Sequence, residues 1–226
     1  GGYTAAGEAA KAGLKTALIE SRELGGTCLH RGCIPTKTLM HSSEFIQAIN
    51  QGIPGMLIRV GGQSVPYDDF RADVDMKVLQ RQRTSVSEQL ADSIRKSLLK
   101  GGVELIQGRA AVVSPHEIEV HPVETYSSDP SFQITAENII LAVGCRPSIL
   151  PVPGIDLEGV MNSDQIIVNE ERPSRLIIVG GGVIGIEFAT IYLGLGSHVT
   201  ILESAPKLLG AVDKEFSQSI RSILKK

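Results

Sequence analysis

Two cysteines with four residues between them stand in the segment 25–37, which reads GGTCLHRGCIPTK. Residues i and i+5 of a regular helix lie on different faces, too far apart for a good disulfide. A bridge therefore needs irregular backbone, which Gly32 and a helix start at Pro35 permit. Cys33 lies just before that predicted helix, whose N-terminal partial charge favours a thiolate. The sequence predicts a redox-active dithiol in which Cys28 is the outer sulfur that exchanges with substrate.

The cysteine pair is also compatible with half of a zinc site, a structural disulfide, or two inert buried thiols, and these alternatives stay open. A zinc site needs four ligands with short pair spacings, and the sequence contains neither a second cysteine pair nor a histidine cluster. We therefore predict no metal site. Three cysteines and no recognisable export signal favour redox or metal chemistry in the cytosol over a disulfide scaffold.

A complete dinucleotide fingerprint, G-x-G-x-x-G, spans residues 180–185. A strand is predicted over 176–179, a helix over 184–195 and a second strand over 198–203, so the motif lies in a βαβ unit. Such glycines permit a tight turn, approach of a pyrophosphate and close helix–strand packing, while the helix start offers free N–H groups. Glu203 would accept hydrogen bonds from ribose hydroxyls and repel the extra phosphate of NADP, which favours NAD. A glycine-rich turn that binds nothing is the alternative.

The chain begins with the end of a similar motif. Gly2 matches the third glycine, residues 3–12 predict the helix, Gly13 ends it, and Glu20 is the ribose acid. We expect the front of this site to be missing and FAD retention to be weak. Two dinucleotide sites and a dithiol beside the first indicate electron transfer from thiols to FAD and on to NAD. Lys37, one turn into its helix, could face the flavin.

The remaining segments complete an α/β chain. Helices are predicted over 36–50 and 67–100, the second from the apolar positions Val78, Leu79, Val86, Leu90, Ile94 and Leu98. Residues 16–20 and 138–143 predict buried strands, and residues 51–66 predict a loop. Short strands over 103–106, 110–113, 118–120 and 132–135 predict an antiparallel β-meander. A proline-rich linker follows, so we divide the chain into an FAD-binding domain over 1–148 and an incomplete NAD-binding domain over 149–226.

Composition agrees with this class. Of the 226 residues 42% are hydrophobic and 24 are glycine, which suits buried strands and tight βα turns. The formal net charge of -3 and the lack of a basic block argue against nucleic acid as a partner. No apolar run reaches the ~18 residues of a membrane span, so we expect no membrane insertion.

Segment 25–37 resembles the active-site signature of the class I pyridine nucleotide–disulfide oxidoreductases. The resemblance covers essentially the whole chain and includes AVGCRP at 142–147 and VGGGVIGIEFA at 179–189. Within the class the dihydrolipoyl dehydrogenases are most similar, because no arginine follows Glu203 to receive the phosphate of NADP. An NADP-linked glutathione or mercuric reductase, or a non-catalytic nucleotide-binding module, is the alternative.

The resemblance implies an enzyme with two Rossmann-like units that oxidises protein-bound dihydrolipoamide through a Cys28–Cys33 disulfide and FAD, with NAD as acceptor. It implies a lipoyl domain of a 2-oxoacid dehydrogenase or related complex as partner, a homodimer in the full-length enzyme, and a cytoplasmic, bacterial location. By the same resemblance we expect this chain to lack the family's C-terminal dimerisation domain with its acid–base His-Glu pair. We therefore expect this chain alone to turn over little or no lipoamide.

The resemblance also assigns roles to residues. The loop from Glu20 to Cys28 wraps the FAD, and Lys37 sits by the flavin and pairs with Glu187 across the two domains. The catalytic residues it implies are Cys28, Cys33, Lys37 and Glu187. The cofactor-binding residues it implies are Gly2, Glu20, Gly26, Thr27, Cys28, Cys33, Lys37, Gly108, Ala110, Ala142, Val143, Gly144, Gly180, Gly182, Val183, Ile184, Gly185, Glu187 and Glu203.

Two departures from the family pattern concern the dithiol and the linker. His30 and Arg31 replace the usual Asn-Val between the cysteines. We interpret His30 as a variant of a subgroup of the family rather than a catalytic base, with surface or core packing as the alternative. Cys145 replaces a small or hydroxyl residue, and we expect a small, buried apolar side chain there. The other histidines receive no acid–base role.

Overall fold

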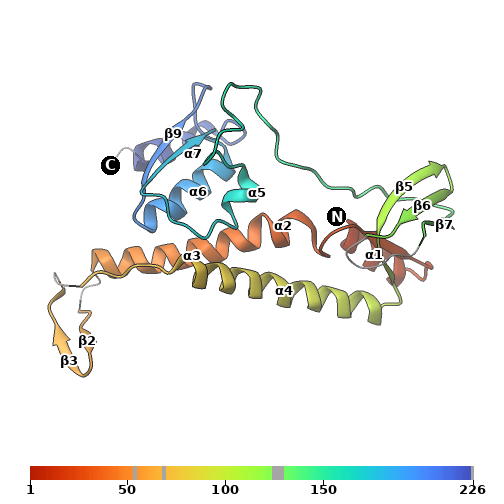
Figure 1. Ribbon diagram of the computed structural model, residues 1–226, viewed down its shortest axis with the longest axis horizontal. Coiled ribbons are helices and arrows are strands. Elements are labelled where there is room, and N and C mark those ends of the chain that lie inside the picture. Colours follow the sequence, from red (N-terminus) through yellow and green to blue (C-terminus); the bar gives the residue numbers. More distant parts are fainter. Residues whose placement is uncertain (53–54, 68–69, 124–129, 225–226) are drawn as a thin grey trace. The chain divides into compact units, whose positions relative to one another are not determined.

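The computed structural model describes residues 1–52, 55–67, 70–123 and 130–224. The chain forms two compact units, the first made of residues 1–34 and 85–148 and the second of 35–84 and 149–226. Helices α3 (Cys33–Gln51) and α4 (Met76–Lys100) each contribute to both units (Figure 1). Residues 35–84 group with the second unit, so these units differ from the two functional domains predicted at 1–148 and 149–226, which stay a prediction.

In the first unit, helix α1 (Gly2–Lys11) leads into strand β1 (Ala17–Glu20), as predicted. Strand β4 (Glu104–Gln107) pairs with β1 in parallel, with Leu18 opposite Leu105. The placement of this strand in the antiparallel meander was therefore wrong. A short apolar run predicts a strand but not its partner, because the partner depends on contacts far away in sequence. The core of this unit contains Ala6, Leu24, Leu98 and Val103.

Strands β5 (Arg109–Ser114), β6 (Glu117–His121) and β7 (Phe132–Thr135) form a three-stranded antiparallel sheet in the order β5-β6-β7. Val120, on the middle strand, is fully buried. Gly108 joins β4 to β5, and a Cβ there would lie 2.6 Å from Val120 Cγ1. Only glycine fits at this junction without displacing the core side chain.

The prediction of a buried strand over 138–143 was wrong. These residues form neither helix nor strand, and Ile140, Leu141 and Val143 are 69%, 70% and 88% exposed. The apolar run has strand propensity, but no strand in the described part of the chain pairs with it. Without that ladder its backbone is not held in a sheet and its side chains stay in solvent.

The second unit contains the predicted βαβ element. Strand β8 (Arg175–Val179), helix α6 (Val183–Gly194) and strand β9 (His198–Leu202) follow one another, and β8 pairs with β9 in parallel. Short helix α5 (Ser163–Ile166) starts with a capping box in which Asn162 and Gln165 bond each other's backbone N–H. Helix α7 (Lys214–Leu224) follows β9. The core is formed by Leu39, Met76, Leu79, Ile166, Ile167, Phe188, Ile191, Tyr192 and Leu195.

The loop predicted over 51–66 contains a hairpin instead, although its residues 53–54 lie outside the described residues. Strands β2 (Ile58–Val60) and β3 (Gln63–Val65) pair antiparallel around Gly61 and Gly62. Both glycines have positive φ, 58° and 84°. A Gly-Gly pair between two short strands is a hairpin signal, because such turns need positive φ at both central positions. The glycines that suggested a loop thus form the turn.

Helix α4 begins at Met76 rather than 67, and of the residues before it 68–69 lie outside the described residues. The Asp75 carboxylate accepts a hydrogen bond from the Val78 N–H (3.1 Å), the contact of an N-cap. Val78 and Leu90, predicted to be buried, are 48% and 40% exposed. The buried face of this helix instead includes three polar residues, Gln80, Arg83 and Ser87.

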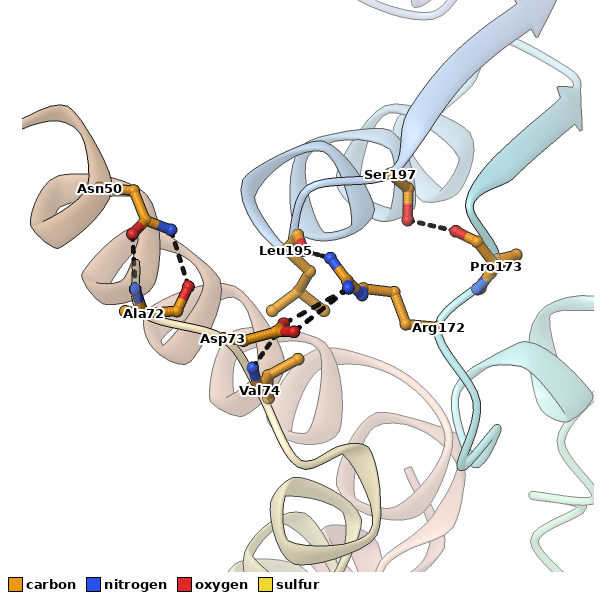
Figure 2. A network of polar contacts seen from close by, with 8 residues as sticks. All are labelled: Asn50, Ala72, Asp73, Val74, Arg172, Pro173, Leu195 and Ser197. Atoms are coloured by element: carbon orange, nitrogen blue, oxygen red, sulfur yellow. Dashed lines mark hydrogen bonds and ion pairs between the residues drawn. The ribbon is translucent and has the colours of Figure 1, made fainter. Parts of the chain in front are cut away.

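An arginine ties the segments of the second unit together (Figure 2). Arg172 donates from Nη1 to the Leu195 carbonyl at the end of α6 (2.5 Å) and pairs with Asp73 (3.4 Å). Asn50 forms two hydrogen bonds with the backbone of Ala72. The C-terminal end of α6 is thereby bound to the chain that precedes α4. In the described ranges, no helix is both long and apolar enough to cross a membrane.

Candidate active site

The two cysteines stand on either side of one tight turn. Cys28 lies in the short helix α2 (Gly26–His30), and Cys33 is the first residue of α3, three residues before the predicted start at residue 36. A Cβ on Gly32 would lie 3.1 Å from the Thr27 carbonyl oxygen and 3.3 Å from Cys28 Cα. Gly32 thus lets the chain return onto Cys28 immediately before Cys33. Both cysteine residues are exposed, so a disulfide substrate in solvent can reach this turn.

The residues between the cysteines hold the preceding loop. His30 Nε2 donates to the Leu24 carbonyl (2.8 Å), so the histidine ring is held by a backbone contact. Its interpretation as a subgroup variant stays a prediction. Arg31 Nη1 lies 3.5 Å from Glu23 Oε2. Leu29 is buried, and its carbonyl accepts a hydrogen bond from Ser87 Oγ of α4 (2.9 Å). The dithiol segment is therefore attached both to its own upstream loop and to a buried position of α4.

Lys37 and Glu187 form an ion pair within the second unit. Lys37 Nζ on α3 lies 2.5 Å from Glu187 Oε1 on α6, with side chains 60% and 25% exposed. Cys33 lies one turn before Lys37 on the same helix. The pair itself is present, but it lies within one unit and not across two domains as expected. It holds the ammonium group one helical turn beyond Cys33, near the start of α3.

The fingerprint turn needs its glycines for three different reasons. Gly180 has φ of 113°, a conformation that favours glycine. A Cβ on Gly185 would collide with the Gly180 carbonyl oxygen, so α6 packs against the turn there. Gly182 is the N-cap of α6, and a Cβ on it would meet no atom within 4 Å. The start of α6 is open at the place where a pyrophosphate would meet its N–H groups, so the turn fits a dinucleotide.

Glu203 closes this turn from the next strand. Its carboxylate accepts hydrogen bonds from the N–H groups of Ala205 and Gly181, each at 2.7 Å, and these donors lower the pKa of the Glu203 carboxyl. A ribose bound at Glu203 would share the carboxylate with the turn. The contact between Glu203 and Gly181 was not predicted. The feature of the sequence that could have indicated it is the glycine at 181, between the first two glycines of the fingerprint, because a side chain there would crowd Glu203.

The residues predicted for the first nucleotide site lie close to one another in the first unit. A Cβ on Gly2 would lie 3.3 Å from Ala142 Cβ. The Glu20 carboxylate accepts from the Arg22 N–H (2.9 Å), and its carbonyl accepts from the Gly108 N–H (2.9 Å). Gly2 and Ala142 thus adjoin at the start of α1, whose N–H groups suit a phosphate. Glu20 and Gly108 adjoin at the end of β1.

Several predicted cofactor residues lie in exposed backbone, and one expectation there was wrong. Gly26, Thr27, Ala110, Val143 and Gly144 are exposed. Cys145, expected to be buried, is exposed as well.

Three buried polar residues of α4 were missed in the sequence. Gln80 donates to the carbonyls of Ile167 (3.1 Å) and Asn169 (2.9 Å) and accepts from Arg83 Nε. Burial lowers the pKa of the Arg83 guanidinium. Together with Ser87 these positions follow helical spacing, which was the available signal; the apolar residues beside them masked it.

The whole chain, residues 1–226, matches the family of pyridine nucleotide-disulphide oxidoreductases. The chain belongs to this family. Among curated oxidoreductases it is similar to the dihydrolipoyl dehydrogenases of Bacillus subtilis (strain 168), 36% identical over 230 residues, and Thermus scotoductus, 37% identical over 229 residues. Each alignment covers 100% of this chain but 46% and 45% of the relative, so the chain spans less than half the length of these relatives.

Solved oxidoreductases of the family share the fold. The Cu(II) complex of the HOCl-induced flavoprotein disulfide reductase RclA from Escherichia coli superposes with a TM-score of 0.76 at 31% identity. It covers 99% of this chain, and this chain covers 44% of it. The similarity to this class that the dithiol signature predicted is confirmed, as is the mixed α/β fold.

Proposed function

We propose that the chain is the dithiol-bearing, nucleotide-binding part of an oxidoreductase of the dihydrolipoyl dehydrogenase type. The observation that carries the proposal is the turn at Gly32, which brings the chain back onto exposed Cys28 next to exposed Cys33. The relatives at 36% and 37% identity support the lipoyl substrate over other disulfides. The NADP-linked glutathione or mercuric reductases remain the alternative within the family.

The chemistry is a dithiol–disulfide exchange. One thiolate of dihydrolipoamide attacks the Cys28 sulfur of a Cys28–Cys33 disulfide, and Cys33 leaves as a thiolate. The second substrate thiolate then attacks the mixed disulfide and expels Cys28, so lipoamide leaves as a cyclic disulfide and the protein holds two reduced sulfurs. FAD, when bound, accepts the two electrons of this dithiol and passes them to NAD.

Two Rossmann-like units are proposed to hold the two cofactors. For FAD, the supporting residues are Gly2 and Ala142 at the start of α1 and Glu20 at the end of β1, with the β5–β7 sheet in the same unit. For NAD, the support is the open N-terminus of α6 and the ionised Glu203. The negative carboxylate favours NAD over NADP, whose extra phosphate it would repel.

The remaining roles follow the family assignment. Cys28 exchanges with substrate, Cys33 faces the flavin, and Lys37 stands by the flavin with its charge held by Glu187. For the longer protein we propose a cytosolic homodimer that serves the lipoyl domain of a 2-oxoacid dehydrogenase or related complex.

A single-turnover experiment tests the exchange without any cofactor. The reduced chain is mixed with excess oxidised lipoamide, and dihydrolipoamide and protein disulfide are quantified together by mass spectrometry. We expect one dihydrolipoamide for each Cys28–Cys33 disulfide formed, and none from Cys28→Ser or Cys33→Ser. Cys145→Ser is the matched control and should react like the parent. A reaction that survives Cys28→Ser and Cys33→Ser would remove the proposal.

Cofactor choice is tested separately by titrating the chain with NADH and NADPH and following the change in nicotinamide fluorescence. We expect NADH to bind more tightly than NADPH. The Glu203→Ser variant should have a smaller difference in affinity between the two nucleotides. Tighter binding of NADPH to the parent would favour the glutathione or mercuric reductase alternative.

A further inference from the structure

Three pairs of residues around Cys28 are nested inside one another. Gly25 packs against Leu29, the Leu24 carbonyl accepts from His30, and Glu23 faces Arg31. In sequence numbers the pairs join 25 with 29, 24 with 30 and 23 with 31, so all three are centred on residue 27. Residues 26–28 therefore form the tip of a small closed loop, and Cys28 lies at that tip.

The inner pair depends on shape. Gly25 has φ of 125°, and a Cβ on it would collide with Leu29 Cδ2 and lie 3.0 Å from Leu29 Cβ. Leu24 and Leu29 are 7% and 6% exposed, so both sides of the loop are anchored in the interior. Apolar packing between Gly25 and Leu29 thus closes the loop at the pair nearest to Cys28.

The two outer pairs are polar and come from residues that depart from the family pattern. His30 Nε2 lies 2.8 Å from the Leu24 carbonyl oxygen, partly shielded from water. Arg31 Nη1 lies 3.5 Å from Glu23 Oε2, and the Arg31 side chain is only 23% exposed. Arg31 also donates its N–H to the Thr27 carbonyl (2.8 Å), inside the loop.

The loop is also fixed to the rest of the first unit. Gln107 Nε2 at the end of β4 donates to the Arg22 carbonyl (3.0 Å), just upstream of the nested pairs. Ser87 Oγ holds the Leu29 carbonyl (2.9 Å) from a fully shielded position. The loop is thus held upstream at Arg22 and internally at Leu29, and the contacts of His30 and Arg31 close it around the segment that carries Cys28.

We propose that His30 and Arg31 are positioning residues that close the loop over 23–31 and so hold Cys28 close to Cys33. This inference rests on the proposed dithiol function. Closure raises the effective concentration of one thiol at the other, because a fixed loop loses less freedom when the disulfide forms. Opening the loop should make the Cys28–Cys33 disulfide less stable and more oxidising.

The experiment measures the effective concentration of this thiol pair. A Cys145→Ser chain is equilibrated in glutathione buffers, where the protein dithiol and glutathione disulfide give the protein disulfide and two molecules of glutathione. The Cys28–Cys33 disulfide is then quantified by mass spectrometry. We expect His30→Leu to lower the effective concentration about tenfold, which corresponds to a reduction potential raised by about 30 mV.

Matched variants separate positioning from general loss of structure. His30→Asn keeps an N–H donor and should recover most of the effect. His116→Leu removes another histidine contact with a backbone carbonyl in the same unit, His116 Nδ1 to Ala136 (3.0 Å), and should leave the thiol pair unchanged. Glu23→Gln, at a side chain 58% exposed, should fold normally and lower the effective concentration two- to threefold.

The outcomes are distinct. Values for His30→Leu and Glu23→Gln within the error of the parent, or an equal change in His116→Leu, would overturn the positioning role while leaving the proposed function intact. If His30→Leu fails to fold, the effective concentrations measured for Glu23→Gln and Arg31→Val test the positioning role without it. A parent in which no Cys28–Cys33 disulfide forms would overturn both proposals.

Discussion

Lys37 of α3 and Glu187 of α6 form an ion pair with 2.5 Å between Nζ and Oε1. The two residues are far apart in sequence, but both belong to the second unit, where their helices contribute to one core. Lys37 is mostly exposed, so solvent screens the attraction.

For this pair we predict a small contribution to stability. Lys37→Met and Glu187→Gln should each lower the free energy of unfolding by less than about 1 kcal/mol, measured by urea denaturation. The double variant should lose little more than either single one, since either single change already removes the attraction between the two side chains. A loss of several kcal/mol would show that the pair holds the fold rather than serving chemistry.

Two glycines of the fingerprint turn should respond differently to alanine. Gly185→Ala places a methyl group against the Gly180 carbonyl and should cost about 1–3 kcal/mol of stability, seen as a lower thermal midpoint. Gly182→Ala meets no protein atom within 4 Å and should fold normally, yet weaken NADH binding, because the methyl group occupies the approach of the pyrophosphate. Unchanged NADH binding in Gly182→Ala would argue against a dinucleotide at this turn.

Glu203 should make stability depend on pH. Hydrogen bonds from Ala205 and Gly181 lower the pKa of its carboxyl in the folded state, so the stabilisation is present above the unfolded pKa of about 4.3. It is lost as the pH falls through the lower folded pKa. In urea midpoints between pH 6 and pH 3, roughly the range of this titration, Glu203→Gln should show a shallower decline than the parent. Parallel curves for parent and variant would contradict this assignment.

Gln80 is expected to matter more than an ordinary helix residue. Gln80→Leu removes the donor for the carbonyls of Ile167 and Asn169, and a buried acceptor left unsatisfied costs about 1–3 kcal/mol. Gln89→Leu is the matched control, since Gln89 lies on the same helix with an exposed contact to Ser85 (3.1 Å). Equal urea midpoints for the two variants would show that the buried contacts contribute little.

Local patterns predicted what depends on local physics. The fingerprint at 180–185 was placed correctly between a strand and a helix, because glycine geometry and apolar periodicity act over a few residues. The cysteine turn was predicted from spacing and from Gly32, whose close approach to Cys28 is found. The position of Glu203 at the end of its strand followed from the same βαβ pattern.

What failed depends on partners far away in sequence. Residues 138–143 have the composition of a buried strand, but no described strand pairs with them. Strand β4 was given the wrong neighbour for the same reason. The buried side of α4 was misjudged because Gln80 and Arg83 are satisfied by each other and by the backbone near Ile167, which no pattern within the helix reveals.

The chain crosses between its two units three times, and one of these crossings could be cut without dividing the core of the second unit. The exposed stretch from 138 to 149 is the only one of the three crossings between the units that is not in a helix. The core of the second unit takes Leu39 and Leu79 from one side of this stretch and Tyr192 and Leu195 from the other. A protease that cut there would divide the polypeptide without dividing that core. Two separately produced polypeptides, one ending and the other beginning near Cys145, would then be candidates for fragment complementation. The core that both fragments contribute to would hold them together.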